Sequence, residues 1–110
     1  MTKHIESYIN PFPSLIQDRY HQLVELLVSI EPTLLPYIWA GVPTFQKDNH
    51  YVRFILFKDH ININTSLGIS VNELKPNYKI TPKGMVQVFT HEPLDLTWMA
   101  LLFRTVFYKV

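Results

Sequence analysis

The fold is decided by the stretch Tyr51-Val52-Arg53-Phe54-Ile55-Leu56-Phe57-Lys58-Asp59-His60-Ile61-Asn62-Ile63-Asn64. Its first half is rich in β-branched and aromatic residues, and its second half alternates apolar and polar residues, as strands do. Lys58-Asp59 between them predicts a two-residue hairpin turn. We therefore expect two antiparallel strands, over residues 51–57 and 60–64.

A two-residue turn fixes which residues face each other across the hairpin. Phe57 is then opposite His60, and Phe54 is opposite Ile63, with opposed side chains on the same side of the sheet. One side carries only apolar residues and is the expected core face: Phe54, Leu56, Ile61 and Ile63. The other side mixes polar and apolar residues and is where a ligand could bind: Arg53, Ile55, Phe57, His60, Asn62 and Asn64. A slip of one residue in the loop would change every pair.

Further strands are expected on both sides of this hairpin. A strand pattern begins at Ile38, where Pro43 predicts an edge strand or a bulge because proline cannot donate to a ladder. We expect Gly41 and Pro43 to shape the backbone rather than to take part in chemistry. Residues 47–50 predict a turn, residues 71–74 a short helical turn before Pro76, and residues 85–89 a strand.

Two amphipathic helices flank these strands. Residues 14–30 form the first, with Ser14 as the expected cap, and the last helix follows Pro93 with Asp95 as its expected N-cap. The expected buried residues of the first helix are Leu15, Ile16, Tyr20, Leu23, Val24, Leu27 and Ile30. Those of the last helix are Leu96, Met99, Ala100, Leu102, Phe103, Val106 and Val110. Its opposite side includes Trp98, Leu101 and Tyr108, which predicts either a dimer interface or packing beneath the N-terminal segment.

Together these elements predict an α+β fold in a single domain over residues 1–110. We expect a two-layer sandwich in which an antiparallel sheet of about four to six strands has the N-terminal and C-terminal helices on one face. The composition agrees, because 47% of the residues are hydrophobic and 17% are charged, as in a packed globular domain.

Charge and composition exclude several classes of function. The net charge is +1, from ten Lys and Arg against nine Asp and Glu, without a block of like charges, so we expect no nucleic-acid partner. The chain has no cysteine, which excludes disulfides and thiolate chemistry and fits a cytoplasmic protein. We expect neither a signal peptide nor a membrane span.

Several short motifs occur in an order that resembles one protein family. They are Gly41, Pro43 and Phe45; Phe57, Lys58, His60 and Ile61; Tyr78; Thr81, Lys83 and Gly84; Phe89; and Pro93 with Leu94. In this order and spacing, over about Ser7 to Tyr108, they resemble the YdhG-like family of small bacterial domains of unknown function. The resemblance implies an α+β sandwich with the architecture of frataxin, and some such domains are described as intracellular iron chaperones.

Iron handling of the frataxin type implies a ridge of acidic residues on the first helix and the adjoining strand edge. The polar side of the first helix offers Asp18 and Glu25, which lie about two turns or ~10 Å apart along the helix axis. This departs from a dense acidic ridge. Iron is therefore a cofactor or cargo implied by the resemblance only, and the residues do not define a metal site.

Six residues are candidates for ligand binding: Trp39, Arg53, Phe57, His60, Asn62 and Lys83. His60 is either a ligand or acid–base group, or a hydrogen-bonded histidine that closes the hairpin. Lys83-Gly84 either presents a cation and backbone N–H groups to an anion, or forms a turn in which Gly84 has unusual dihedral angles. Trp39 is either a core residue or part of a cleft. No pairing of a nucleophile with a base is visible, so no catalytic residue is assigned.

Three functions follow from these candidates. The first is a non-enzymatic binding protein, a chaperone for iron or a small ligand. The second is an interaction module that forms a homodimer through the last helix. The third is an enzyme on a small anionic substrate that uses His60 and Lys83.

Overall fold

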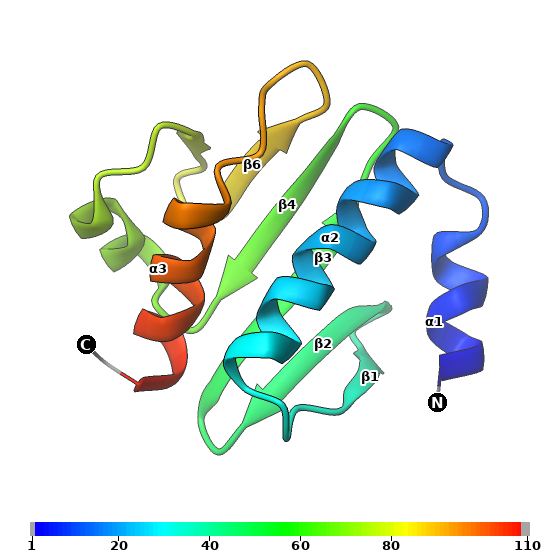
Figure 1. Cartoon of the computed structure of the whole chain (residues 1–110), viewed down its shortest axis with the longest axis horizontal. Coiled ribbons are helices and arrows are strands. Elements are labelled where there is room, and N and C mark those ends of the chain that lie inside the picture. Colours follow the sequence, from blue (N-terminus) through cyan, green and yellow to red (C-terminus); the bar gives the residue numbers. More distant parts are fainter. Residues whose placement is uncertain (1, 109–110) are drawn as a thin grey trace.

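The computed structural model describes residues 2–108 as one six-stranded antiparallel sheet with helices (Figure 1). The elements are α1 (Thr2–Ile9), α2 (Ser14–Ile30), β1 (Pro36–Trp39), β2 (Val42–Lys47), β3 (His50–Leu56), β4 (His60–Thr65), the 3-10 helix η1 (Gly68–Leu74), β5 (Lys79–Ile80), β6 (Val86–Phe89) and α3 (Leu96–Tyr108). The strand order is β1-β2-β3-β4-β6-β5.

Helices α2 and α3 lie side by side on one face of the sheet, and α1 lies beyond α2, near β1 and β2 (Figure 1). This confirms the predicted α+β fold with helices from both ends of the chain on an antiparallel sheet. None of the helices among residues 2–108 is long and apolar enough to cross a membrane.

The central hairpin has the predicted register. Phe54 pairs with Ile63 and Leu56 with Ile61, and the Phe57 amide donates to the His60 carbonyl across the Lys58-Asp59 turn at 2.9 Å. The predicted core residues of both strands are buried, with at most 4% of their surface exposed. Phe54 lies at the centre of the aromatic core, where it contacts Tyr20, Phe45 and Phe103 edge to face.

Several helix predictions were wrong in detail. Pro13, not Ser14, occupies the cap position of α2, and there is no side-chain cap hydrogen bond. Leu15 and Leu96 are exposed, because each lies in the first two residues of its helix, before the helix meets the sheet.

Trp98 is buried, because its ring packs on Tyr78 and its Nε1 donates to the Leu74 carbonyl at 2.9 Å. The predicted Asp95 cap is confirmed, because the Trp98 amide donates a hydrogen bond to Asp95 Oδ1 at 3.0 Å. Val110, which was predicted to be a core residue, lies outside the described residues.

The prediction of an edge strand or bulge at Gly41 and Pro43 was also wrong. Ala40 and Gly41, both with positive φ, form a two-residue turn between β1 and β2, and β2 pairs on both sides. Since Trp39 and Val42 close this turn as a hydrogen-bonded pair, alternation directs the backbone nitrogen of Pro43 toward β3. Pro43 has no N–H to donate, and the pairing of β2 with β3 accordingly begins only at Thr44 opposite Arg53.

The end of this pairing leaves the far part of β3 without a strand neighbour on that side, and α1 fills the gap. The Leu56 amide, which alternation also directs toward β2, donates instead to the hydroxyl of Tyr8 at 3.0 Å. Ile5 and Ile9 of the same helix are buried in the core. Helix α1 was not predicted from the sequence. Its Tyr8 hydroxyl accepts the hydrogen bond of Leu56 because the pairing of β2 with β3 ends at Pro43 and offers Leu56 no strand partner.

Gly84 allows a turn to pack against η1. Its φ is +92°, and a Cβ atom at this position would lie 2.3 Å from the backbone carbon of Gly68. The turn is closed by two hydrogen bonds of Thr81, which accepts from the Gly84 amide and donates to the Met85 carbonyl. The prediction that Gly84 has unusual dihedral angles is confirmed, and the close approach to Gly68 adds a second requirement for glycine.

Tyr8→Phe should destabilise the protein by about 1–3 kcal/mol, because it leaves the Leu56 amide without an acceptor. Tyr37→Phe is the matched control, since the Tyr37 hydroxyl donates to the exposed side chain of Gln46. Urea unfolding of both variants checks this expectation. Equal losses of stability in the two variants would contradict the role assigned to Tyr8.

Gly84→Ala should cost clearly more stability than Gly41→Ala. Both glycines have positive φ, which costs other residues roughly 1–2 kcal/mol, but a Cβ at Gly41 meets no atom within 4 Å. The difference between the two variants in thermal or urea unfolding therefore measures the contact of Gly84 with Gly68. Similar midpoints for the two variants would show that this contact relaxes at no cost.

Candidate functional site

The sheet face opposite α2 and α3, here called the open face, is the candidate site. Register and alternation place on it the following strand residues: Tyr37, Trp39, Val42, Thr44, Gln46, Tyr51, Arg53, Ile55, His60, Asn62, Asn64, Lys79, Gln87 and Phe89. None of them is Asp or Glu, because all nine acidic residues of the chain lie in helices, turns or loops. The strands of the open face therefore contribute aromatic, amide and cationic side chains, and the Asp59 carboxylate adjoins this face at the hairpin end, beside His60.

Arg53 is held between two aromatic rings on this face. Its Cζ atom lies 3.9 Å from the centroid of the Trp39 ring and 3.8 Å from that of Tyr51, which are cation–π distances. Its Nε is buried and has no hydrogen-bond partner among residues 2–108. The rings therefore fix the plane of the guanidinium group, and no acidic side chain neutralises it. A planar, fixed guanidinium is suited to binding a carboxylate or phosphate through two parallel hydrogen bonds.

A second aromatic cluster surrounds His60 at the hairpin end of the open face. The His60 ring stacks on Phe57, with centroids 4.2 Å apart and planes 6° apart, and on Phe89 at 4.8 Å. Its Nδ1 lies 2.8 Å from the Asp59 carboxylate, and this hydrogen bond lowers the pKa of Asp59. His60 is thus hydrogen-bonded and packed at the hairpin, whereas Phe57 keeps 40% of its surface exposed.

Asn62 lies between the two clusters, on the strand next to Arg53. It is 8% exposed, its Nδ2 lies 3.9 Å from the Met85 sulfur, and its Oδ1 is buried with no partner among the described residues. Two buried side-chain atoms of the open face, the Arg53 Nε donor and the Asn62 Oδ1 acceptor, thus have no partner among residues 2–108. Buried polar groups are normally paired, so both atoms indicate a place where water or a ligand completes the site.

The structure brings five of the six predicted site residues onto or beside the open face and leaves Lys83 apart. Lys83 lies in the turn that precedes β6, whereas His60 pairs with Phe89 at the other end of that strand. The strand between them alone spans ~10 Å. The two side chains that the enzyme hypothesis combined are therefore not neighbours. Trp39 is not a core residue, because half of its surface is exposed above the sheet.

Sequence reasoning did not include Tyr51 and Phe89 among the site residues. Tyr51 lies two residues before Arg53 on the same strand, so strand alternation alone could have placed it on the same face. Phe89 reaches His60 only through the pairing of β4 with β6, which skips the segment from η1 to β5. No local sequence signal reports that pairing.

The described residues do not gather a metal site. Among residues 2–108, no group of three or more His, Asp and Glu side chains is arranged to hold an ion. Asp18 and Glu25 are both exposed on α2, on the helix side of the sheet. The open face offers nitrogen donors and amides rather than the carboxylates that a hard cation requires.

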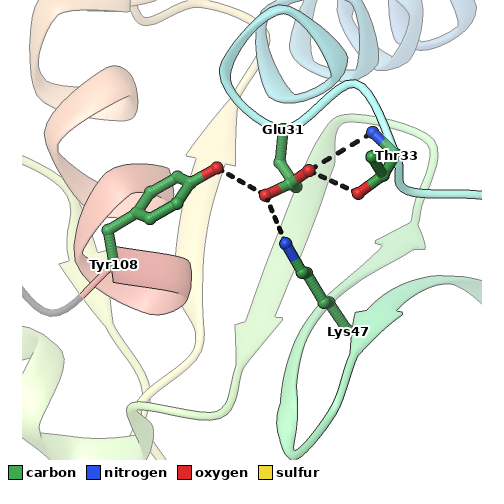
Figure 2. Close-up of polar contacts among 4 residues, drawn as sticks. All are labelled: Glu31, Thr33, Lys47 and Tyr108. Carbon is green, nitrogen blue, oxygen red and sulfur yellow. Dashed lines mark hydrogen bonds and ion pairs between the residues drawn. The ribbon is translucent and has the colours of Figure 1, made fainter.

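Among residues 2–108, Glu31 is the one buried carboxylate, and its partners join three elements (Figure 2). Lys47 of β2 donates to its Oε1 at 3.0 Å, the Tyr108 hydroxyl of α3 donates to the same oxygen, and Thr33 donates to Oε2 from both its amide and its hydroxyl. The hydrogen bonds from Thr33, Tyr108 and Lys47 lower the pKa of Glu31 to about 2. A carboxylate with this many donors stays ionised, so Glu31 fastens the end of α2 to β2 and α3.

The helix side of the sheet has its own hollows. One of about 410 Å³ lies between α2 and α3, lined by Leu26, Ser29, Ile30, Arg104 and Tyr108.

The apolar strip predicted on α3 consists of Trp98, Leu101 and Tyr108. Trp98 is buried within the chain, so the exposed part of the strip is Leu101 and Tyr108, at 40% and 51%. The sequence left two alternatives for this strip, a dimer interface or packing beneath the N-terminal segment. Trp98 does pack within the chain, but it packs against η1 and not against the N-terminal segment.

The fold and the open face define a class of protein: a small α+β domain whose sheet is covered by helices on one side and free on the other. No model of a protein family matches the chain, and no curated protein matches it.

Among solved structures, the chain is similar to the crystal structure of YdhG, a DUF1801 family protein from Bacillus subtilis. The TM-score is 0.74, the sequence identity is 16%, and the match covers 96% of this chain and 90% of that one. At this identity the likeness shows the shared fold. It agrees with the resemblance that the motifs indicated.

The Glu31 network predicts an acid-sensitive contribution to stability. The folded-state pKa of Glu31 is lowered from 4.5 to about 2, so this contribution is fully present above pH 4.5 and is lost as the pH falls toward 2. Glu31→Gln should lower the melting temperature at neutral pH and show a smaller further decrease in this window. Melting temperatures of the wild type and the variant across the window test this, and parallel curves would contradict it.

Proposed function

We propose that this protein is a non-enzymatic binding protein that holds an anionic group against Arg53 on the open face. The observation that supports the proposal is the position of Arg53 between Trp39 and Tyr51, with a buried, unpartnered Nε. A guanidinium used only for packing would be expected to pair with a carboxylate or a carbonyl. A fixed and unpaired one is already oriented for a ligand, so little entropy is lost when the ligand binds.

The chemical class of the ligand follows from the surroundings of Arg53. Without a carboxylate on the open face, nothing competes with an incoming anion for the guanidinium. Asn64 lies opposite Arg53 on β4, and Asn62 is on the same strand, so amide groups that can donate or accept lie next to the cation. Carboxylate and phosphate groups both match this arrangement.

Nuclear magnetic resonance of the arginine Nε–Hε groups tests the proposal directly. Titration with inorganic phosphate, and separately with citrate, should shift the Arg53 signal saturably while the signal of Arg104 on α3 changes little. Arg53→Lys should weaken binding roughly tenfold or more, because lysine keeps the charge but loses the paired hydrogen bonds. Arg104→Lys is the matched control. No saturable shift at Arg53, or equal shifts at both arginines, would refute the proposal.

The iron version of the binding function stays a prediction from the resemblance. Asp18 and Glu25 are its candidate ligands, and a further ligand would have to come from outside the described arrangement. Calorimetric titration with Fe(II), repeated on Asp18→Asn and Glu25→Gln variants, tests it. An absence of binding at millimolar iron would remove iron from the candidate ligands.

The homodimer also stays a prediction, now restricted to Leu96, Leu101 and the exposed part of Tyr108 on α3. Sedimentation at high protein concentration should give a dimeric mass that Leu101→Glu reduces to that of a monomer. A monomeric mass for the wild type would remove this second candidate.

A further inference from the structure

The composition of the open face is that of a protein interface. Four cavities of the molecule are lined by helix, loop and core-side residues, and none of their lining residues lies on the open face. Trp39 and Phe57 are exposed on the open face or at its hairpin end, by 50% and 40%. Exposed Trp, Tyr, Phe and Arg side chains with few acidic residues distinguish the energetically important part of protein interfaces from ordinary surface.

The two aromatic clusters have a defined spacing along β3. Arg53 and Phe57 are four residues apart on one strand and its continuation, which corresponds to ~13 Å at the rise of an extended chain. Both point to the same side of the sheet. A polypeptide segment lying along β3 would therefore contact the cation with one side chain and the second cluster with a side chain about four extended residues away.

Charge determines which kind of segment fits. The strand residues of the open face include Arg53 and Lys79 and no acid, so an acidic partner is attracted and a basic one is repelled. The guanidinium of Arg53 would gain hydrogen bonds from a carboxylate, and the exposed edge of Phe57 would be covered by an apolar side chain. Nucleic acid fits less well, since it needs several cations for its phosphates and the open face has few.

We infer that the open face docks an extended segment of a partner protein, which places an acidic residue against Arg53 and an apolar residue against Phe57 and Phe89. This inference rests on the proposed function, because the acidic residue would occupy the anion position at Arg53. It adds that the partner is a protein segment and that the two residues of the segment that contact the open face lie about four positions apart.

Panning a phage library of random peptides against the full chain tests the inference, with counter-selection on the Trp39→Ala variant. The enriched peptides should combine Asp or Glu with an aromatic or aliphatic residue about four positions away. Synthetic versions should bind roughly tenfold or more weakly to Arg53→Gln and to Phe57→Ala. Leu15→Ala, which removes an exposed apolar side chain from α2 on the helix side, is the matched control and should bind as the wild type does.

Three outcomes would overturn the inference. The first is that no peptide is enriched. The second is that enriched peptides bind the Arg53 and Phe57 variants as tightly as the wild type. The third is that a fluorescent oligothymidylate binds in an Arg53-dependent way while the peptides do not, which would make the partner a nucleic acid. A preserved phosphate shift at Arg53 in these cases would leave the proposed function intact, and its absence would remove both.

Discussion

The register of the β3–β4 hairpin is the constraint on which the rest of the structure depends. Its two-residue turn assigns Phe54, Leu56, Ile61 and Ile63 to one side, and a shift of one residue would exchange the two faces. The buried side then requires the helices that cover it, and the other side keeps Arg53, His60 and Asn62 together. The core and the candidate site are therefore two consequences of one pairing.

Sequence patterns predicted the parts of the fold that local interactions determine. The hairpin register and the Asp95 cap depend on residues close in the chain, and both were confirmed. The position of helix α1 depends on residues far away in the chain. Its Tyr8 hydroxyl accepts the Leu56 amide at the place where Pro43 ends the pairing of β2 with β3. The error at Pro43 had a related cause: proline does exclude one ladder bond, but the strand remains paired on its other side.

The same distinction applies to the site. Alternation along one hairpin was enough to place Arg53, Phe57, His60 and Asn62 on the open face. The contacts that give these residues their character come from other strands: Trp39 from β1 for Arg53, and Phe89 from β6 for His60. Sequence could therefore locate the face but not the pairing of cation with ring. Lys83 was misplaced because its distance from His60 depends on the direction of β6 relative to β4.

Glu31 and Arg53 are two charged side chains whose charges the fold compensates to different degrees. Glu31 is buried and accepts hydrogen bonds from three residues, so its charge is compensated within the fold and contributes to stability. Arg53 is held as firmly, but by rings that compensate its charge only partly, and its buried Nε has no acceptor among residues 2–108. A buried donor without a partner costs about 1–3 kcal/mol, so the Arg53 side chain is held at a cost that Glu31 does not carry. The fold therefore compensates Glu31 fully and Arg53 only in part, and this difference separates a structural charge from the charge on the open face.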